Sequence, residues 1–181
     1  KRWFDITVLT FQPFRIKAEK YQEFFYPKGS LKIHRMNWNF HSHAWAGLSL
    51  KNFILAFPAL MACAFVLNIK KKYEIIHAQG LLSGFVAVLL KRLFGCKVYI
   101  TLLALYEFDK MDNNQKWIAR HIFKNCDIIF VEGQGGKNDI GCFRLDESRI
   151  RIFQHWVDQD LFRPPKSRDK SPIRVLFVGR P

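Results

Sequence analysis

Two short segments of the sequence place polar side chains where they could act on a hydroxyl-bearing ligand. His77, Gln79 and Gly80 come at the end of one apolar run, and Glu107 and Asp109 lie within the acidic segment YEFDK. Histidine and carboxylate groups can move a proton or orient a hydroxyl, and glycine allows a tight backbone turn. The residues also fit a simpler interpretation, because a backbone carbonyl can hold a histidine and acidic groups on a loop are often only solvated.

An aromatic pair lies further along the chain at His155 and Trp156. A flat apolar ring suits the CH face of a pyranose sugar or a lipid chain. The same pair can instead pack at a hinge between domains, and the sequence leaves both interpretations open.

Alternating apolar runs predict the elements that position these residues. Short runs rich in β-branched or aromatic residues alternate with longer stretches of helical period, which is typical of βαβ units and a parallel sheet. The predicted strands are residues 4–10, 31–36, 74–78, 97–101, 127–131, 149–153 and 173–178, and the predicted helices are residues 50–71, 82–94, 114–125 and 136–143. We therefore expect an α/β fold, a Rossmann-like three-layer domain with a parallel β-sheet. The strand-to-helix turn at Gly80 then lies at the carboxyl edge of that sheet, where ligands of such folds bind.

A polar, proline-bracketed stretch divides the chain unequally. It predicts a domain over residues 1–164, a linker over residues 165–172, and a new strand over residues 173–181 that starts a second domain. A lone strand cannot form a domain, so the second unit is expected to be truncated here.

Composition and charge limit the partners. The 181 residues are 49% hydrophobic, and 29 Lys and Arg residues outnumber 15 Asp and Glu residues to give a net charge of +14. Such an excess attracts anionic partners: nucleic acid, an acidic membrane leaflet or a phosphorylated substrate. Aromatic and basic residues are interleaved near the N-terminus, but no nucleic-acid motif accompanies them, so no nucleic-acid partner is expected.

The charge-free run over residues 53–67 raises the question of a membrane. It is too short to span a bilayer, which needs about 20 apolar residues. It can be a buried helix of the domain or a helix that rests on an anionic membrane surface, where Lys70, Lys71 and Lys72 would anchor it.

The cysteines do not form a metal or disulfide pattern. Cys63, Cys96, Cys126 and Cys142 are too far apart for a CxxC pair, and no secretory signal opens the chain. We expect reduced thiols in a cytoplasmic protein and no bound metal.

Several segments, in order, resemble the family 4 glycosyltransferases of the GT-B fold. Residues 73–101 (YEIIHAQG…KVYIT) are similar to the family's strand, His-Ala-x-Gly turn, helix and strand, and YEFDK lies where the family has an acidic loop. Residues 126–140 are similar to its next strand and turn, and residues 148–164 to the segment that carries Val-Asp and then Phe-x-Pro. The strand IRVLFVGR, residues 173–180, resembles the opening of the family's donor domain.

The resemblance implies an enzyme: a retaining hexosyltransferase-type glycosyltransferase that moves a sugar from a nucleotide-diphosphate sugar to a glycan or lipid-linked acceptor. It implies that Gly179 and Arg180 bind the donor diphosphate, where a guanidinium can form two hydrogen bonds to phosphate oxygens. It places the acceptor cleft at His77, Gln79, Gly80, Glu107, His155 and Trp156. No cofactor or metal is implied beyond the donor substrate. The expected location is the cytoplasm, either free or peripherally at the inner face of the membrane.

The sequence departs from the family at two places near this cleft. The family continues its strand into His-Gly where this chain has Leu102 and Leu103, and it has Asn-Gly where this chain has His155 and Trp156. The family also begins with a strand and a glycine-rich loop upstream of the match to residues 4–10. These departures leave a rival interpretation, a non-catalytic GT-B-like binding or scaffold protein, with a nucleic-acid-binding module as a weaker third.

Overall fold

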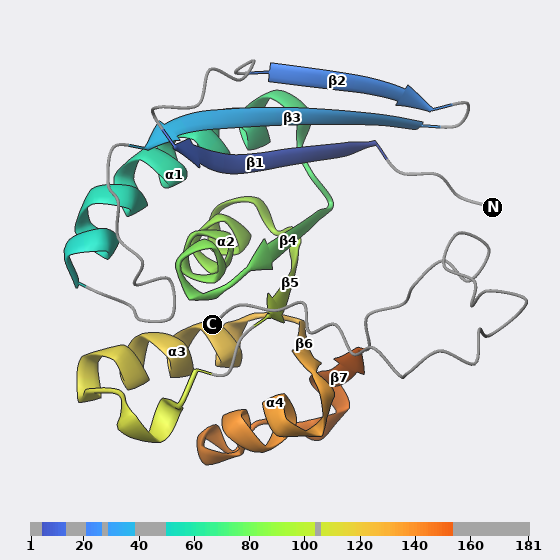
Figure 1. The fold of residues 1–181 in the computed structure, drawn as a ribbon. Coiled ribbons are helices and arrows are strands. Elements are labelled where there is room, and N and C mark those ends of the chain that lie inside the picture. Colours follow the sequence, from blue (N-terminus) through green and yellow to red (C-terminus); the bar gives the residue numbers. More distant parts are fainter. Residues whose placement is uncertain (1–4, 14–20, 27–28, 39–49, 104–105, 154–181) are drawn as a thin grey trace, which may run out of the picture.

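A computed structural model describes residues 5–13, 21–26, 29–38, 50–103 and 106–153 of the chain. Within these residues the protein is an α/β fold with two β-sheets (Figure 1). In the first sheet, β1 (Ile6–Pro13) pairs in parallel with β3 (Gly29–Trp38), and β2 (Tyr21–Tyr26) pairs antiparallel with the other edge of β3.

The second sheet is parallel throughout and follows chain order. It consists of β4 (Ile75–Gln79), β5 (Lys97–Leu102), β6 (Ile128–Glu132) and β7 (Ile150–Phe153). Because each of these strands returns through a helical or turn segment, all four carboxyl ends meet at one edge.

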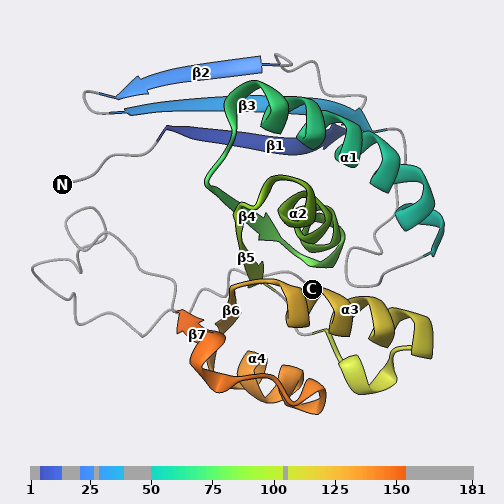
Figure 2. The same ribbon diagram turned by 180° about the vertical axis from the view of Figure 1, so that it is seen from behind.

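Within the described residues, four α-helices connect and cover the strands (Figures 1 and 2). They are α1 (Leu50–Lys71), α2 (Leu81–Phe94), α3 (Asn113–Asn125) and the short α4 (Gly133–Asp139), with 3₁₀ turns at Phe108–Lys110, Ile140–Phe143 and Glu147–Arg149. The ends of the helices follow from local chemistry. Asp112 and Gln115 form a capping box at the start of α3, and Gly95, with a φ of 72°, closes α2 in the left-handed conformation.

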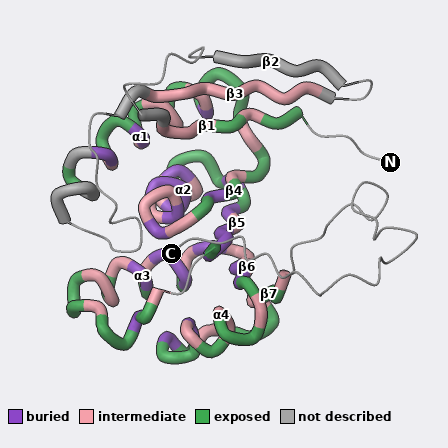
Figure 3. Tube along the Cα trace, viewed as in Figure 1, coloured by how far each residue is buried: buried purple, intermediate pink, exposed green. Residues whose placement is uncertain are grey.

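The main core lies between the second sheet and helices α2 and α3. Alternate residues of β5, namely Val98, Ile100 and Leu102, face these helices and are buried. Figure 3 shows the same concentration of buried residues along α2 and β5. The rings of Phe108, Phe123 and Phe143 close the core beside the turn after β5, with centroids 5.0 to 5.6 Å apart.

A second, smaller core lies under the first sheet. Leu60 of α1 packs with Val86 and Leu90 of α2, and Leu9 and Phe11 of β1 lie against this cluster. Helix α2 therefore contributes to both cores and holds the two sheets in one body.

A charged group fixes the register where β5 and β6 begin. Asp127 accepts hydrogen bonds from Lys91 Nζ and from the backbone N–H of Val98, both at 2.7 Å. Burial pushes the pKa of the Asp127 carboxyl upward, but these two hydrogen bonds and the positive charges of Lys91 and Arg149 together hold the pKa below its ordinary value. The carboxylate thus stays charged and ties α2 to the sheet.

The predicted α/β fold with parallel sheets is confirmed, with three differences. Strand β2 is absent from the sequence prediction, and its antiparallel pairing makes the first sheet mixed. The predicted helix 136–143 begins earlier, at Gly133, and continues as a 3₁₀ turn. The single predicted sheet is divided in two, because the described residues place no strand between β1 and β4.

Other sequence predictions meet the structure only in part. The strand predicted at residues 173–178 and the linker at residues 165–172 lie outside the described residues. Cys96 and Cys126 are buried free thiols, Cys63 is half-buried, and Cys142 is exposed. None of the described helices is long and apolar enough to cross a membrane.

Candidate functional site

The candidate site is the carboxyl edge of the second sheet, where β4 ends at Gln79 and β5 at Leu102. Ligands of parallel α/β sheets bind at this edge because the loops and the N-termini of the following helices converge there. The structure places the predicted turn residues Gln79 and Gly80 at this edge. Gln79 is exposed and Gly80 precedes the first residue of α2.

Gly80 makes the sharp turn from β4 into α2. Its φ of 85° and ψ of 176° lie in a region that glycine alone adopts readily. Its N–H donates to the carbonyl of Thr101 at 3.0 Å, so the turn is fixed to the neighbouring strand. A Cβ added at Gly80 would lie 3.3 Å from Tyr106 Oη, which shows how closely the loop after β5 approaches the turn.

The start of α2 keeps its backbone N–H groups free of a side-chain cap. The Ser83 hydroxyl donates to the carbonyls of Gln79, at 2.5 Å, and Gly80, at 3.2 Å. It therefore stabilises the turn instead of capping the first helical N–H groups. The positive end of the helix dipole at this position favours an anionic or electron-rich ligand group.

The loop after β5 is anchored by aromatic residues. Tyr106 donates its backbone N–H to Asp139 Oδ2 at 2.9 Å, and its ring stacks on buried Phe108 with centroids 5.3 Å apart. Burial raises the pKa of the Tyr106 phenol above its ordinary value, so it stays a neutral hydroxyl. Tyr106 is thereby held against Gly80 as a potential hydrogen-bond donor and acceptor at the sheet edge.

The predicted acidic residues of this loop lie at the surface. Glu107 adopts a φ of 43° and accepts a hydrogen bond from Lys110 Nζ at 2.7 Å, and both side chains are well exposed. The carbonyl of Asp109 accepts from Lys116 Nζ at 2.8 Å. The Glu107 carboxylate is therefore paired with Lys110, and Glu107 directly follows Tyr106, which lies against the Gly80 turn.

His77 is the third of the five β4 residues, two residues before the end of the strand. Its Nε2 lies 2.6 Å from Thr101 Oγ1, and its ring lies 5.8 Å from the ring of Phe130. These neighbours partly desolvate the ring, and this burial lowers the pKa of His77 so that the neutral form is favoured. Its partner is a hydroxyl, not the backbone carbonyl considered above. By strand alternation it shares a sheet face with Gln79, so it lines the approach to the edge.

The structure brings together Gln79, Gly80 and the loop of Glu107, and it adds Tyr106 and Thr101, which the sequence argument did not single out. Tyr106 opens the YEFDK segment and Thr101 closes its strand. Both residues flank the turn that follows the predicted strand 97–101, and this position could have identified them from the sequence. His155, Trp156, Gly179 and Arg180 lie outside the described residues.

Two further features bear on the chemistry of the edge. Leu103, which is 46% exposed, follows β5 where the resemblance expects part of a His-Gly pair. In the part of the chain that the structure describes, no cluster of three or more His, Cys, Asp or Glu residues could hold a metal ion.

The fold is similar to that of sucrose-phosphate synthase from Thermosynechococcus elongatus, with a TM-score of 0.64 at 19% identity. The similarity covers 87% of this chain and 40% of that chain, so this chain spans less than half the length of the other protein. The UDP-GlcNAc 2-epimerase from Methanocaldococcus jannaschii gives a TM-score of 0.46 at 10% identity, with 82% and 45% covered. No family model matches the sequence, and no curated protein matches it.

The first of these similarities establishes the fold and nothing finer. The chain has the Rossmann-like α/β architecture of one half of a GT-B-type structure. At this level of identity the similarity shows architecture alone.

Proposed function

We propose that this chain is the acceptor-side half of a retaining glycosyltransferase, an enzyme that moves a sugar from a nucleotide-diphosphate sugar to a glycan or lipid-linked acceptor. The observation that carries the proposal is the similarity of 87% of the chain to a sucrose-phosphate synthase structure, a protein whose name denotes synthesis of a sugar phosphate. The resemblance of residues 73–180 to family 4 glycosyltransferases supports the proposal independently, because it rests on sequence motifs and not on the fold.

The residues at the sheet edge suit an acceptor site. Gln79 offers an exposed amide with donors and an acceptor, and the neutral phenol of Tyr106 offers a hydroxyl beside the Gly80 turn. Neutral hydrogen-bonding groups orient sugar hydroxyls without the desolvation cost of a charge. In this proposal these residues position the acceptor, and His77 supports the edge through its contact with Thr101.

The donor diphosphate belongs, in this proposal, to the second half of the molecule. Gly179 and Arg180 would begin that site, and a guanidinium there would neutralise charge on the leaving diphosphate. No metal or other cofactor is needed in this scheme, since helix dipoles and basic side chains can supply the same stabilisation.

The alternative is a non-catalytic GT-B-like binding or scaffold protein. The exposed Leu103 favours it, because an apolar side chain there cannot form the polar contact that the resemblance places next to the transferred sugar. This alternative predicts a binding protein with an intact fold and no turnover.

Turnover by the protein of the full reading frame separates the two functions. We expect release of nucleoside diphosphate from a panel of nucleotide-diphosphate sugars only when a glycan or lipid-linked acceptor is present. Proton NMR of the product should show the anomeric configuration of the donor. Donor binding without any turnover across the panel would favour the scaffold, and an inverted product would refute the retaining mechanism.

The proposed location is the cytoplasm, with peripheral contact between α1 and an anionic membrane. Helix α1 buries one face on α2 and exposes an apolar stripe on the other, which includes Ile54, Val66 and Ile69 at 59%, 48% and 54% exposure. Phe65 extends this stripe onto α2 through its contact with Phe94, with centroids 5.4 Å apart. The lysines that end α1 follow the stripe directly, as expected for a helix at a lipid surface.

A further inference from the structure

Helix α3 leaves one large apolar side chain at the surface. The helix packs beside α2 against the second sheet (Figure 1), and its residues Ala119, Ile122 and Phe123 are buried there. Trp117, by contrast, is 63% exposed. A single exposed apolar residue is ordinary in a folded protein, so the surroundings of Trp117 decide whether it has a binding role.

A stacked ring holds the indole of Trp117 in place. The imidazole of His121, one turn later on α3, lies at 22° to it with ring centroids 5.6 Å apart. His121 in turn lies against Phe85 of α2, with centroids 6.0 Å apart. Burial, and after it the charge of Arg92, lowers the pKa of His121, so the neutral imidazole is favoured. Because the stack covers one face of the indole, the exposed area of Trp117 belongs to its other face and its edges.

Polar side chains surround Trp117 on the surface of α3. Asn113 and Asn114 precede it by four and three residues, Arg120 follows it by three, and each of them is exposed. Residues three or four positions apart are neighbours on a helix. Amides both donate and accept hydrogen bonds, and a guanidinium donates several in one plane. The ring therefore lies among groups that match hydroxyl and carboxylate oxygens.

This combination fits a sugar better than a lipid surface. A pyranose has an apolar CH face, which stacks on an aromatic ring, and a rim of hydroxyl groups. A helix on a membrane needs a continuous apolar face, such as the stripe on α1. The exposed neighbours of Trp117 on α3 are polar, so α3 has no such stripe.

The charge of α3 indicates which kind of sugar. The helix contains Lys116, Arg120 and Lys124 and no Asp or Glu. The carboxylate of Asp112, which precedes the helix, is occupied as its N-cap. Three cations without an acidic residue in the helix favour an anionic ligand, and a guanidinium binds a carboxylate or phosphate through two hydrogen bonds.

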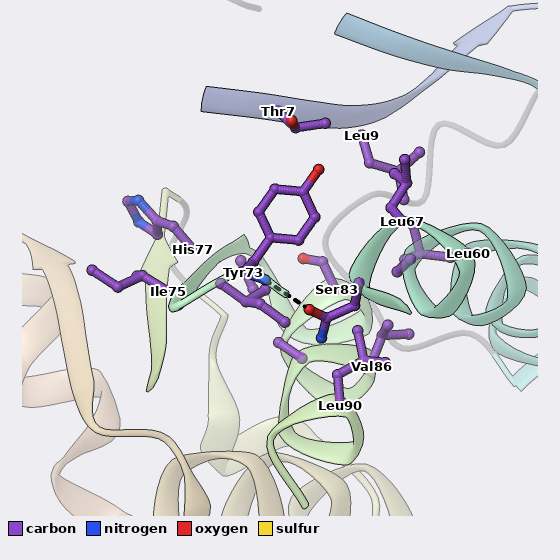
Figure 4. A pocket seen from close by; sticks show the side chains of 15 residues that line it. Thr7, Leu9, Leu60, Leu67, Tyr73, Ile75, His77, Ser83, Val86 and Leu90 are labelled. Atoms are coloured by element: carbon purple, nitrogen blue, oxygen red, sulfur yellow. Dashed lines mark hydrogen bonds between the residues drawn. The ribbon is translucent and has the colours of Figure 1, made fainter. Parts of the chain in front are cut away.

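The cavity between β1, β4, α1 and α2 does not offer this chemistry. It has a volume of about 160 Å³, and none of its lining residues is Lys, Arg, Asp or Glu. Leu60, Leu67, Val86 and Leu90 form much of its wall, and Figure 4 shows the Tyr73 side chain extending across it toward β1. Aliphatic walls do not hold a charged sugar, which leaves the surface of α3 as the better site.

We propose that Trp117 and Arg120 form a surface binding site for an acidic glycan. A pyranose ring of this glycan stacks on the free face of the Trp117 indole, and its carboxylate, phosphate or sulfate group pairs with Arg120. Lys116 donates to the carbonyl of Asp109 at 2.8 Å, so the site is joined to the loop after β5, which borders the candidate acceptor edge. The inference does not depend on the proposed transferase, because a scaffold protein would bind a glycan through the same surface.

A glycan array with the full-length protein tests the proposal. The array carries defined neutral oligosaccharides and acidic ones that bear uronate, phosphate or sulfate groups. We expect binding to acidic glycans, and Trp117→Ala should weaken binding to the best of them at least about 10-fold, because it removes a tryptophan anchor. Trp117→Phe keeps a flat ring and should retain most of the affinity.

Leu93→Ala is the matched control. Leu93 is a similarly exposed apolar side chain, at 60%, but it lies on α2. This variant should bind glycans as the unmodified protein does. Both positions are exposed, so Trp117→Ala and Leu93→Ala should each keep Tm within about 3 °C of the unmodified protein. Failure of the unmodified protein to bind any acidic glycan, or equal losses in these two variants, would overturn the proposal.

Arg120→Gln tests the charge. It should weaken binding to the acidic glycan about 10-fold and leave binding to the uncharged form of the same glycan unchanged. Lys97→Gln, the control, removes an equal charge from an exposed position at the start of β5. If the unmodified protein binds the charged and uncharged forms equally, or if both variants lose affinity equally, Arg120 does not read an acidic group and the proposal fails.

Anionic vesicles test the rival occupant, a lipid surface. Trp117→Ala should bind them as well as the unmodified protein does, because Trp117 has no apolar stripe around it. A loss of vesicle binding in this variant, with no loss in Leu93→Ala, would identify lipid as the partner of Trp117 and refute the glycan site.

Discussion

Gly80 combines a backbone conformation and a close contact that other residues cannot reproduce. Its φ of 85° and ψ of 176° cost a residue with a Cβ roughly 1–3 kcal/mol, and that Cβ would also lie 3.3 Å from Tyr106 Oη. We expect Gly80→Ala to lower the free energy of unfolding by about 2–3 kcal/mol, as measured by urea denaturation.

Gly95→Ala is the matched control, because Gly95 also has a positive φ, 72°, but nothing lies within 4 Å of its added Cβ. It should cost only about 1–2 kcal/mol, the cost of the left-handed conformation. Adding Tyr106→Phe to Gly80→Ala should recover part of the extra loss. Equal losses in the two glycine variants would show that the contact with Tyr106 is absent.

Single residues of the site were predictable from sequence to different degrees. Gln79 and Gly80 follow from the rule that a parallel strand turns into a helix at the binding edge, and they lie there. His77 lies two residues before the end of β4, because the strand continues one residue beyond its predicted end, to Gln79. The approach of Tyr106 to Gly80 joins residues 26 positions apart and depends on how Phe108 anchors the loop, which local sequence does not encode.

At the level of elements, α1 exposes an apolar face that suits a membrane surface. Three lysines at its end, Lys70, Lys71 and Lys72, are exposed beside the apolar stripe. Each lysine near an anionic leaflet contributes about 1 kcal/mol. Changing all three to Gln should therefore weaken binding to anionic vesicles by about 2–3 kcal/mol, roughly 100-fold, and salt should weaken the binding of the unmodified protein.

Vesicle sedimentation of the full-length protein measures this effect. A control variant with Lys97, Arg120 and Lys124 changed to Gln removes the same charge from exposed positions on β5 and α3. It should retain most of the binding. If both triple variants lose affinity equally, net charge and not the α1 surface drives the contact. If the unmodified protein does not bind anionic vesicles, α1 is only part of the core.

The elements themselves were predictable where pattern and length agree. Residues 50–71 form α1 with the predicted bounds, because a long apolar run without strand-like alternation leaves helix as the only consistent choice. Strand β2 was missed because its residues, YQEFFY, lie in an aromatic and basic stretch without clear alternation. Its strand state comes from pairing with β3, a non-local interaction.

At the scale of the whole molecule, the described residues form two sheets, with the strand orders β1-β3-β2 and β4-β5-β6-β7. Sequence periodicity could not reveal the division into two sheets, because it reports each element separately and not which strands pair. The chain covers 40% of the sucrose-phosphate synthase chain to which its fold is similar. The proposed transferase therefore needs a donor-binding half in addition to the described residues.

Arg180, at the start of the predicted donor half, can be tested in the full-length protein. If Arg180 contacts the donor diphosphate, Arg180→Ala removes a charge-assisted hydrogen bond and should weaken donor binding by about 1.5–3 kcal/mol, roughly 10- to 100-fold in Kd. Arg174→Ala, in the same predicted strand six residues earlier, removes an equal charge outside the Gly-Arg pair. Isothermal titration with the preferred nucleotide-diphosphate sugar should detect the loss for Arg180→Ala only. Unchanged affinity in Arg180→Ala would place the diphosphate elsewhere, and an equal loss in both variants would reduce the effect to long-range charge, which raising the salt concentration would then abolish.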